Sequence, residues 1–295
     1  MAIVHEFKYF KPKKLKEAVS LLAEHKHSVV LAGGTDLVPN LKDGTRTPSA
    51  VVDIKGIATL AGLDFRGKML RIGALATFSD LIASEIVRKR FPLILEMAKT
   101  VASTAIRNRA TAVGNICSAV PCTDCGPVLC VYDAIIHVAG TGCNLRYPVS
   151  TWFKGPRQTA IKGPEIVTSV AVPQPAVEYG GCFIKLGRYK GEDLAQASVT
   201  VLALPRNQYR VAFGSVAPVP LRAKKIEALL KGKSLDESLI NAAVKLISEE
   251  IAPITDVRAS KEYRLYMCEV MFRRAIETAV QRLHGGGPTY GTVLI

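Results

Sequence analysis

The sequence contains no apolar run long enough to cross a membrane. Apolar stretches such as residues 198–204 and 134–139 fall far short of the roughly 20 residues that a transmembrane helix needs. Residues 1–16 carry charge throughout and lack the apolar core and small-residue cleavage site of a signal peptide. We therefore expect a cytoplasmic protein with no membrane span, whose seven cysteines are reduced thiols.

Acidic residues are scarce relative to basic ones. The chain has 25 Asp and Glu against 39 Lys and Arg, which gives a formal net charge of +14. Such a balance indicates an acidic partner or a nucleic acid. The basic residues are scattered, with no interleaved aromatics and no zinc finger or RNP motif. A solvated basic face, or one that meets an acidic partner, is favoured over nucleic-acid binding, which stays the weaker alternative.

The remaining composition is that of a folded protein. Hydrophobic residues make up 48% and charged residues 22% of the 295 positions. That length predicts two domains or one large domain. The Pro-rich segment 172–176 is the best candidate boundary, and residues 285–295 are expected to form a frayed tail.

Hydrophobic periodicity predicts mixed helices and strands. Strands are expected at 27–31, 50–54, 134–138, 145–149, 165–172, 182–186, 196–205 and 209–217, with a hairpin at 62–74. Helices are expected at 15–22, near 77–80, and at 92–102, 221–230, 235–250 and 260–282. Glycine-bearing loops are expected between 103 and 133.

Two small-residue segments stand out as ligand-binding candidates. Gly33 and Gly34 follow a strand directly, where glycines allow a ligand to approach the backbone and N–H groups can surround phosphate oxygens. The segment 111–115, TAVGN, also combines a glycine with hydrogen-bonding side chains. Alone, the glycine pair after a strand is more often an ordinary turn, and residues 111–115 could be an ordinary polar loop whose Asn caps a turn.

Taken together, these segments belong to an ordered set of motifs. The set is FKYFKP at 7–12, LAGGTD at 31–36, VVDI at 51–54, IGA at 72–74, TAVGN at 111–115, PCTD at 121–124, FIKLGR at 183–188 and VRAS at 257–260. In this order the sequence closely resembles the FAD-binding medium subunit of the molybdenum hydroxylases, the xanthine dehydrogenase and carbon monoxide dehydrogenase family. The resemblance extends from about residue 7 to 274.

The resemblance implies an α+β fold. Residues 1–175 would form an FAD-binding domain of two α/β subdomains, about 1–58 and 59–175, in the vanillyl-alcohol-oxidase-like arrangement. Residues 176–284 would form a C-terminal domain of three antiparallel strands and a helical bundle.

The resemblance also implies the cofactor-binding residues. The FAD pyrophosphate would lie against Ala32, Gly33, Gly34, Thr35, Asp36, Thr111, Ala112, Gly114 and Asn115. Asp124 matches a carboxylate that contacts the flavin, Val167 an apolar contact, and Lys185 a basic residue next to the cofactor. Val113 departs from the family, which usually has glycine there, and its β-branched side chain requires a negative φ and adds bulk.

The implied chemistry is electron transfer, with no catalytic residue assigned to this chain. Electrons would pass from molybdenum on a large subunit, through [2Fe-2S] centres on a small subunit, to FAD and then to NAD or another acceptor. Molybdopterin and the [2Fe-2S] centres would belong to those partners, in a heterotrimer that pairs into a dimer of heterotrimers. A stand-alone flavoprotein oxidoreductase is the alternative.

Five cysteines are clustered after the second segment, at Cys117, Cys122, Cys125, Cys130 and Cys143. Two interpretations stay open. Four thiolates could hold a [4Fe-4S] cluster, with Cys122 and Cys125 the surest ligands, although the spacing matches no standard ferredoxin motif. Alternatively, they are small buried hydrophobes and ordinary free thiols.

Overall fold

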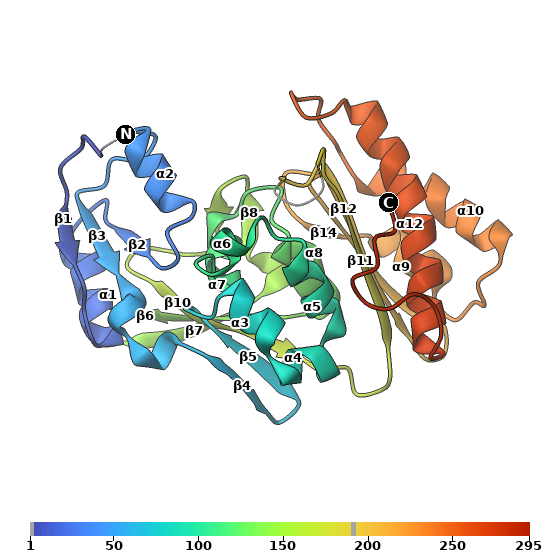
Figure 1. Cartoon of the computed structure of the whole chain (residues 1–295), viewed down its shortest axis with the longest axis horizontal. Helices are drawn as coiled ribbons and strands as arrows, with labels where there is room; N and C mark the ends of the chain where they lie inside the picture. Colours follow the sequence, from blue (N-terminus) through green and yellow to red (C-terminus); the bar gives the residue numbers. More distant parts are fainter. Residues whose placement is uncertain (1–2, 190–192) are drawn as a thin grey trace.

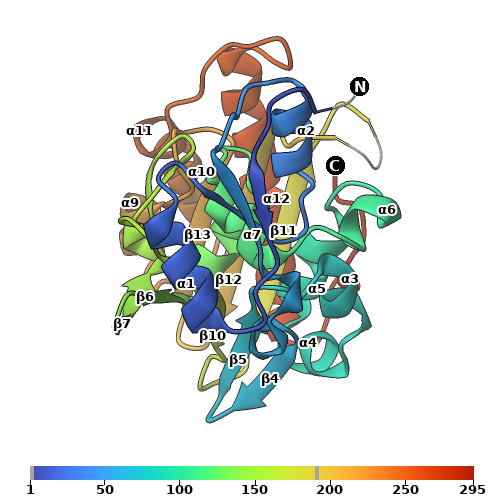
Figure 2. The same ribbon diagram turned by 90° about the vertical axis from the view of Figure 1, so that its left-hand side faces the viewer.

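The computed structural model describes residues 3–189 and 193–295. A small α/β unit forms one end of the molecule and the long C-terminal helix lies at the other (Figures 1 and 2). The sheet of this unit is parallel, in the order β1-β3-β2. Its elements are β1 (Lys8–Phe10), α1 (Leu15–Glu24), β2 (Val29–Leu31), α2 (Leu37–Lys42) and β3 (Ala50–Asp53). Helix α1 buries Ala18 and Val19, while its polar residues face outward, as the helical spacing predicts.

A five-stranded antiparallel sheet forms the middle of the molecule, in the order β4-β5-β10-β6-β7. Its strands are β4 (Leu63–Arg66), β5 (Met69–Gly73), β6 (Ile135–Gly140), β7 (Cys143–Pro148) and β10 (Ile166–Pro173). The connections contain the 3-10 helices η1 (Ile54–Gly56), η2 (Ala58–Leu60) and η3 (Val149–Thr151) and the short hairpin of β8 (Phe153–Gly155) and β9 (Gln158–Thr159). The predicted hairpin and all three predicted strands of this region are confirmed.

Six short helices lie between β5 and β6. They are α3 (Phe78–Ala83), α4 (Glu85–Arg90), α5 (Pro92–Lys99), α6 (Thr104–Arg107), α7 (Ala112–Ser118) and α8 (Cys125–Val131). Thr77 and Asp80 form a capping box at the start of α3, and Pro92 begins α5. The expectation of glycine-bearing loops between 103 and 133 is wrong, because α6, α7 and α8 are too short for apolar periodicity to reveal them.

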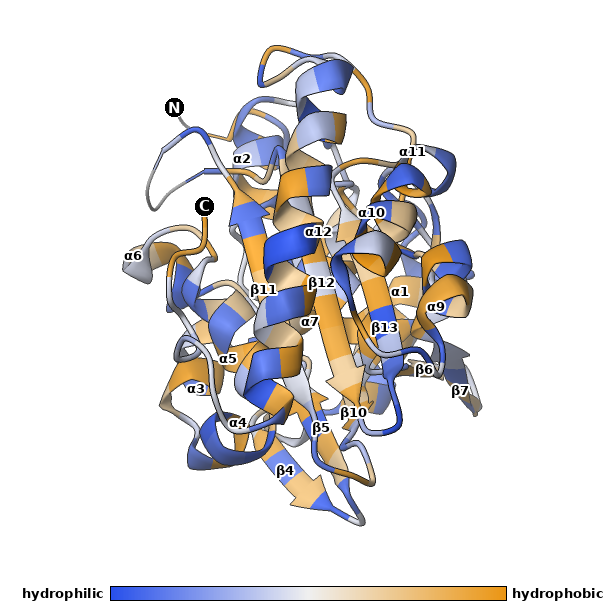
Figure 3. Cartoon of the chain, turned by 90° about the vertical axis from the view of Figure 1, so that its right-hand side faces the viewer, coloured by the Kyte–Doolittle hydropathy of each residue, from blue (hydrophilic) through white to orange (hydrophobic). Residues whose placement is uncertain are grey.

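The C-terminal part is an antiparallel sheet covered by helices. The sheet order is β11-β12-β13-β14, with β11 (Gly180–Leu186), β12 (Ala197–Leu204), β13 (Gln208–Gly214) and β14 (Leu221–Arg222). The helices are α9 (Lys224–Leu230), α10 (Glu237–Lys245), α11 (Ile247–Glu250) and α12 (Lys261–Leu283). The three predicted strands are confirmed, and the two-residue β14 adds a fourth. Figure 3 shows the hydrophobic β11 and β12 behind α12.

Both faces of this sheet are buried. Val199 and Val201 of β12 pack with α12 in one hydrophobic core, whereas Leu202 and Leu204 of the same strand belong to the core of residues before 175. Alternating side chains of a strand lie on opposite faces, so the sheet separates two cores while contacting both. The division into domains 1–175 and 176–284 stays a prediction.

The tail after α12 is packed rather than frayed. The N–H of Gly291 donates to Glu96 Oε1 of α5 at 2.9 Å, and the Arg282 guanidinium lies over the Tyr290 ring at 4.0 Å from its centroid. Arg282 and Glu96 form an ion pair with both side chains 3% exposed. The expectation of a frayed tail is therefore wrong, because a buried charge pair and an aromatic contact hold the segment. Among the described residues, no helix is both long and apolar enough to span a membrane.

Candidate functional site

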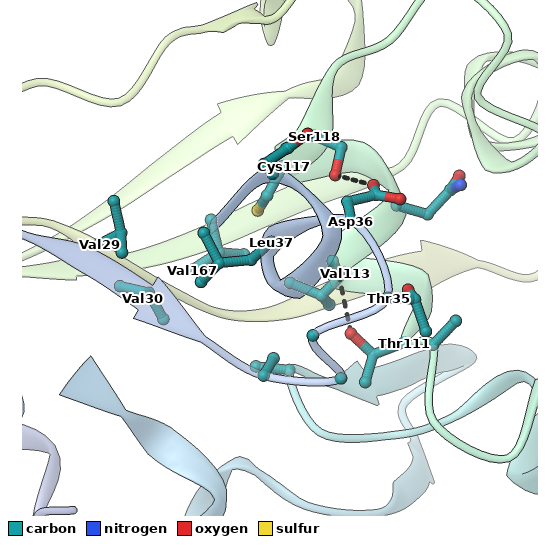
Figure 4. A pocket seen from close by; sticks show the side chains of 18 of the residues that line it. Val29, Val30, Thr35, Asp36, Leu37, Thr111, Val113, Cys117, Ser118 and Val167 are labelled. Atoms are coloured by element: carbon teal, nitrogen blue, oxygen red, sulfur yellow. Dashed lines mark hydrogen bonds between the residues drawn. The ribbon is translucent and has the colours of Figure 1, made fainter. Parts of the chain in front are cut away.

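A cavity of about 1090 Å³ lies between the N-terminal unit and the rest of the chain. Its wall contains every candidate cofactor-binding residue except Ala112: Ala32, Gly33, Gly34, Thr35, Asp36, Thr111, Gly114, Asn115, Asp124, Val167 and Lys185. Ala112 is buried but does not belong to this wall. The fold thus brings together residues that lie more than 150 positions apart in the chain, such as Ala32 and Lys185. Figure 4 shows part of this wall, with residues from β2, α2 and α7 around the cavity.

The first glycine turn connects β2 to α2 at the edge of the cavity. Gly34 has a φ of +78°, which a residue with a side chain rarely adopts. Gly33 packs tightly against the backbone just before the second segment, because a Cβ on Gly33 would stand 2.1 Å from the carbonyl oxygen of Arg109. Among the backbone hydrogen bonds of the described residues, none uses the N–H of Gly33, Gly34 or Thr35 as donor. These N–H groups are therefore available to an anion in the cavity.

The second segment is the start of a helix rather than a loop. Thr111 is the N-cap of α7, and its Oγ1 accepts the N–H of Gly114 at 2.9 Å (Figure 4). A Cβ on Gly114 would stand 2.9 Å from the same oxygen, so glycine preserves the cap. The N–H of Gly114 is thus used within the helix start, and the contact of Gly114 with the pyrophosphate stays a prediction.

The apolar part of the wall faces this turn. Figure 4 shows Leu37, Val113 and Val167 converging, with Val29 nearby. Val113 is buried in α7 and has no positive φ, so the backbone tolerates this β-branched residue. The Ser118 hydroxyl donates to Asp36 Oδ2 and ties the end of α7 to the start of α2.

A buried ion pair forms the deep polar part of the wall. The Lys185 Nζ of β11 lies 2.9 Å from Asp124 Oδ2 and also donates to the carbonyl oxygen of Thr100 at 3.1 Å. Both charged side chains are 8% exposed. Burial raises the pKa of the Asp124 carboxyl, and the Lys185 ammonium opposes that rise. Asp124 Oδ1 is buried and has no hydrogen-bond partner within the described ranges.

Asn115 connects the two helices that border the site. Its Oδ1 accepts the Thr123 hydroxyl at 2.5 Å and the Cys125 N–H at 3.2 Å. The side-chain oxygen therefore holds the turn before α8, while Asn115 itself lines the cavity. The side-chain amide nitrogen of Asn115 has no part in either bond.

The cysteines do not assemble a metal site. In the described part of the chain, no three His, Cys, Asp or Glu side chains are grouped as a metal ion would require. Cys125 and Cys130 are buried in α8, Cys143 is exposed at the start of β7, and Cys117 lines the cavity. Burial raises the pKa of Cys117 and of Cys130 to about 12. The described arrangement favours ordinary thiols, and the cluster interpretation stays an untested prediction.

Several wall residues escaped the sequence analysis. His25, Lys26, Ser28, Asn40 and Arg46 extend the cavity along the N-terminal unit. Basic residues just before the strand that leads to the glycine turn were the available signal, since they favour an anionic ligand. Leu37 and Ser118 gave none, because they reach the cavity only through the fold, in which Ser118 of α7 bonds Asp36 at the start of α2.

Two family models match the chain. The model described as the FAD binding domain in molybdopterin dehydrogenase matches residues 5–175, and the CO dehydrogenase flavoprotein C-terminal domain matches residues 187–279. The chain belongs to the FAD-binding subunits of the molybdenum hydroxylases. It is thus part of an oxidoreductase, and its cofactor is FAD.

Similar proteins extend over nearly the whole length of this subunit. The carbon monoxide dehydrogenase medium chain of Afipia carboxidovorans is 31% identical over 280 residues, which are 94% of this chain and 97% of that protein. The xanthine dehydrogenase FAD-binding subunit of Escherichia coli O157:H7 is 29% identical over 283 residues, with coverage of 94% and 97%. A chain of carbon monoxide dehydrogenase from Hydrogenophaga pseudoflava superposes with a TM-score of 0.92 at 32% identity, with 96% of this chain and 99% of that one covered.

The cavity of this FAD-binding subunit suits a dinucleotide with a flavin. Unused N–H groups of residues 33–35 can bind phosphate oxygens, and the apolar side chains of Leu37, Val113 and Val167 can pack on a ring system. The unpartnered Asp124 Oδ1 offers an acceptor to a donor of the ligand. The donor set of the wall therefore fits FAD.

Proposed function

We propose that FAD binds in the 1090 Å³ cavity and that this chain relays electrons from [2Fe-2S] centres of a partner subunit to NAD or another acceptor. The observation that carries the proposal is the convergence of the glycine turn, the start of α7 and the Asp124–Lys185 pair on one cavity. The flavin supplies the redox step when it is bound, and the chain supplies its position and surroundings.

Each group of wall residues has a separate task in this proposal. The N–H groups of residues 33–35 bind the pyrophosphate, as an oriented set of dipoles. The apolar side chains Leu37, Val113 and Val167 exclude water from the ring. Lys185 and Asp124 set the local charge, and charges beside a flavin tune its redox properties.

The chain's partners in this proposal are a small subunit with [2Fe-2S] centres and a large subunit with the molybdenum cofactor. Support comes from the names of the similar proteins, which are a medium chain and a FAD-binding subunit. Further support comes from the similar carbon monoxide dehydrogenase structure, which is described as lacking the Mo-pyranopterin moiety of the molybdenum cofactor. We further propose a cytoplasmic heterotrimer that pairs into a dimer of heterotrimers. The net charge of +14 suits an acidic partner surface.

Purification from the native source tests this proposal. We expect the chain to co-purify with two other subunits, one FAD per chain, iron and molybdenum, with a mass that fits two copies of each subunit. A flavin-containing chain that purifies alone and reduces an acceptor by itself would favour the stand-alone alternative. A chain with bound nucleic acid and no flavin would contradict both.

A further inference from the structure

Thr123, the residue next to Asp124 in the cavity wall, points away from the cavity and into the protein. Cys122 and Asp124 line the cavity, whereas Thr123 between them is 1% exposed and does not line it. The Thr123 hydroxyl donates to Asn115 Oδ1 at 2.5 Å, and the N–H of Cys125 donates to the same oxygen at 3.2 Å. One amide oxygen thus holds the residues on both sides of Asp124.

The surroundings of Thr123 leave its side chain little freedom. A Cβ on Gly126 would stand 2.9 Å from the Thr123 methyl carbon and 2.4 Å from Pro220 Cγ, so Gly126 is needed for this close packing. A β-branched residue has few allowed rotamers. The methyl group faces Gly126 and the hydroxyl faces Asn115, which fixes the turn.

The C-terminal part of the chain holds the other side of the turn. The N–H of Ser215 donates to the carbonyl oxygen of Pro121 at 3.0 Å, and Lys185 holds Asp124 Oδ2. Asp124 Oδ1 remains buried without a partner among the described residues. A buried carboxylate oxygen without a hydrogen-bond donor costs free energy. Since Oδ2 is paired and Oδ1 is not in the described part of the chain, we expect a bound ligand to supply the donor for Oδ1.

We propose that Thr123 is a positioning residue for the flavin: its hydrogen bond to Asn115 sets the direction in which Asp124 presents Oδ1 to bound FAD. This inference rests on the proposed binding of FAD in the cavity. Thr123 itself does not touch the cofactor, and it acts through Asp124.

A double-mutant cycle on the full chain tests the inference. The variants are Thr123→Val, Asp124→Asn and the double variant, with Thr123→Ser as the control that keeps the hydroxyl and Thr123→Ala as a second variant that cannot overpack. We expect Thr123→Val to weaken FAD binding roughly tenfold, the effect of about one hydrogen bond, and to shift the visible flavin spectrum. Thr123→Ser should behave like the wild type. In the Asp124→Asn background, Thr123→Val should change the Kd by less than about twofold.

Two results would overturn the inference. Equal losses from Thr123→Val in both backgrounds, with no spectral shift, would mean that Thr123 only stabilises the fold. Wild-type affinity and spectrum in both Thr123→Val and Thr123→Ala would mean that the hydrogen bond is irrelevant to the flavin. A wild-type chain that binds no FAD would instead contradict the proposed function itself, and this inference with it.

Discussion

Gly33 lies against the backbone of Arg109, so closely that a Cβ on Gly33 would stand 2.1 Å from the Arg109 carbonyl oxygen. The two segments that border the cavity, one after β2 and one before α7, therefore touch each other through main-chain atoms. The absence of a side chain at Gly33 therefore allows the two edges of the site to pack together, and it also allows a ligand to approach the backbone.

Replacing Gly33 with Ala should separate these edges. We expect a loss of about 1–3 kcal/mol in the free energy of unfolding, as for other overpacked sites, and weaker FAD binding. Thermal unfolding and FAD titration measure the two effects. Gly286→Ala is the matched control, because its Cβ would meet nothing closer than 3.7 Å. Equal behaviour of the two variants would contradict the contact.

The free energy of unfolding is expected to depend on pH through the buried carboxyl of Asp53. Burial raises its pKa, but hydrogen bonds from Tyr9, at 2.5 Å, and from Lys55 outweigh burial, so the net pKa is lowered. A carboxyl with a lowered folded pKa stabilises the fold above its ordinary pKa, and this stabilisation disappears as the pH falls through the lowered value.

Tyr9→Phe should therefore reduce the free energy of unfolding by about 1 kcal/mol at pH 7, and by progressively less as the pH falls below 3.8 and through the lowered pKa of Asp53. Urea unfolding across this pH range is the measurement. Tyr266→Phe, at a side chain that is 61% exposed, serves as control and should change little. A Tyr9→Phe effect that is the same at every pH would show that the hydroxyl acts independently of the Asp53 charge.

The long elements of the fold could be predicted from the sequence, and the short ones could not. Elements such as β12 and the 23-residue α12 are long enough for their apolar pattern to be recognised in the sequence. Helix α7 has only seven residues. Its start resembles a polar loop in the sequence because Thr111, which caps the helix, and Asn115, which bonds the turn before α8, are both polar. The packed tail was missed because its anchor, Glu96, lies 195 positions away from Gly291.

The site was only partly visible in the sequence. The glycine turn is local and could be recognised from Gly33 and Gly34. Asp124 and Lys185 were each named only through the family resemblance, and their pairing across 61 positions was not predicted. Thr123 gave no signal, since its role depends on a turn that the sequence pattern does not reveal.

Glu96 is predicted to anchor the tail and the C-terminal sheet at once. Its carboxylate accepts the N–H of Phe183 at 2.8 Å and that of Gly291 at 2.9 Å, besides pairing with Arg282. Glu96→Gln should lower the free energy of unfolding by about 3 kcal/mol, because it leaves the buried Arg282 without a counter-charge. Exposed Glu262→Gln should change it by less than about 0.5 kcal/mol. Chemical denaturation that gives equal values for both variants would rule out the anchor.

The cysteines are predicted to behave as ordinary thiols. Cys143 is exposed and should react first with a thiol reagent, whereas the buried Cys130, whose pKa burial raises to about 12, should react only after unfolding. Timed labelling followed by mass spectrometry gives the order. Iron and acid-labile sulfide assays on anaerobically purified chain should find neither. Stoichiometric iron would support the cluster interpretation and contradict this prediction.

Hydrogen exchange of the full chain with and without FAD tests the central claim, that the cofactor binds between the glycine turn and the start of α7. Mass spectrometry of peptides that cover residues 32–36 and 111–125 should show slower exchange once FAD is bound at one molecule per chain. Peptides from α10, at the far end of the molecule, should exchange at the same rate in both samples. FAD bound at full stoichiometry without any protection of 32–36 and 111–125 would contradict the account.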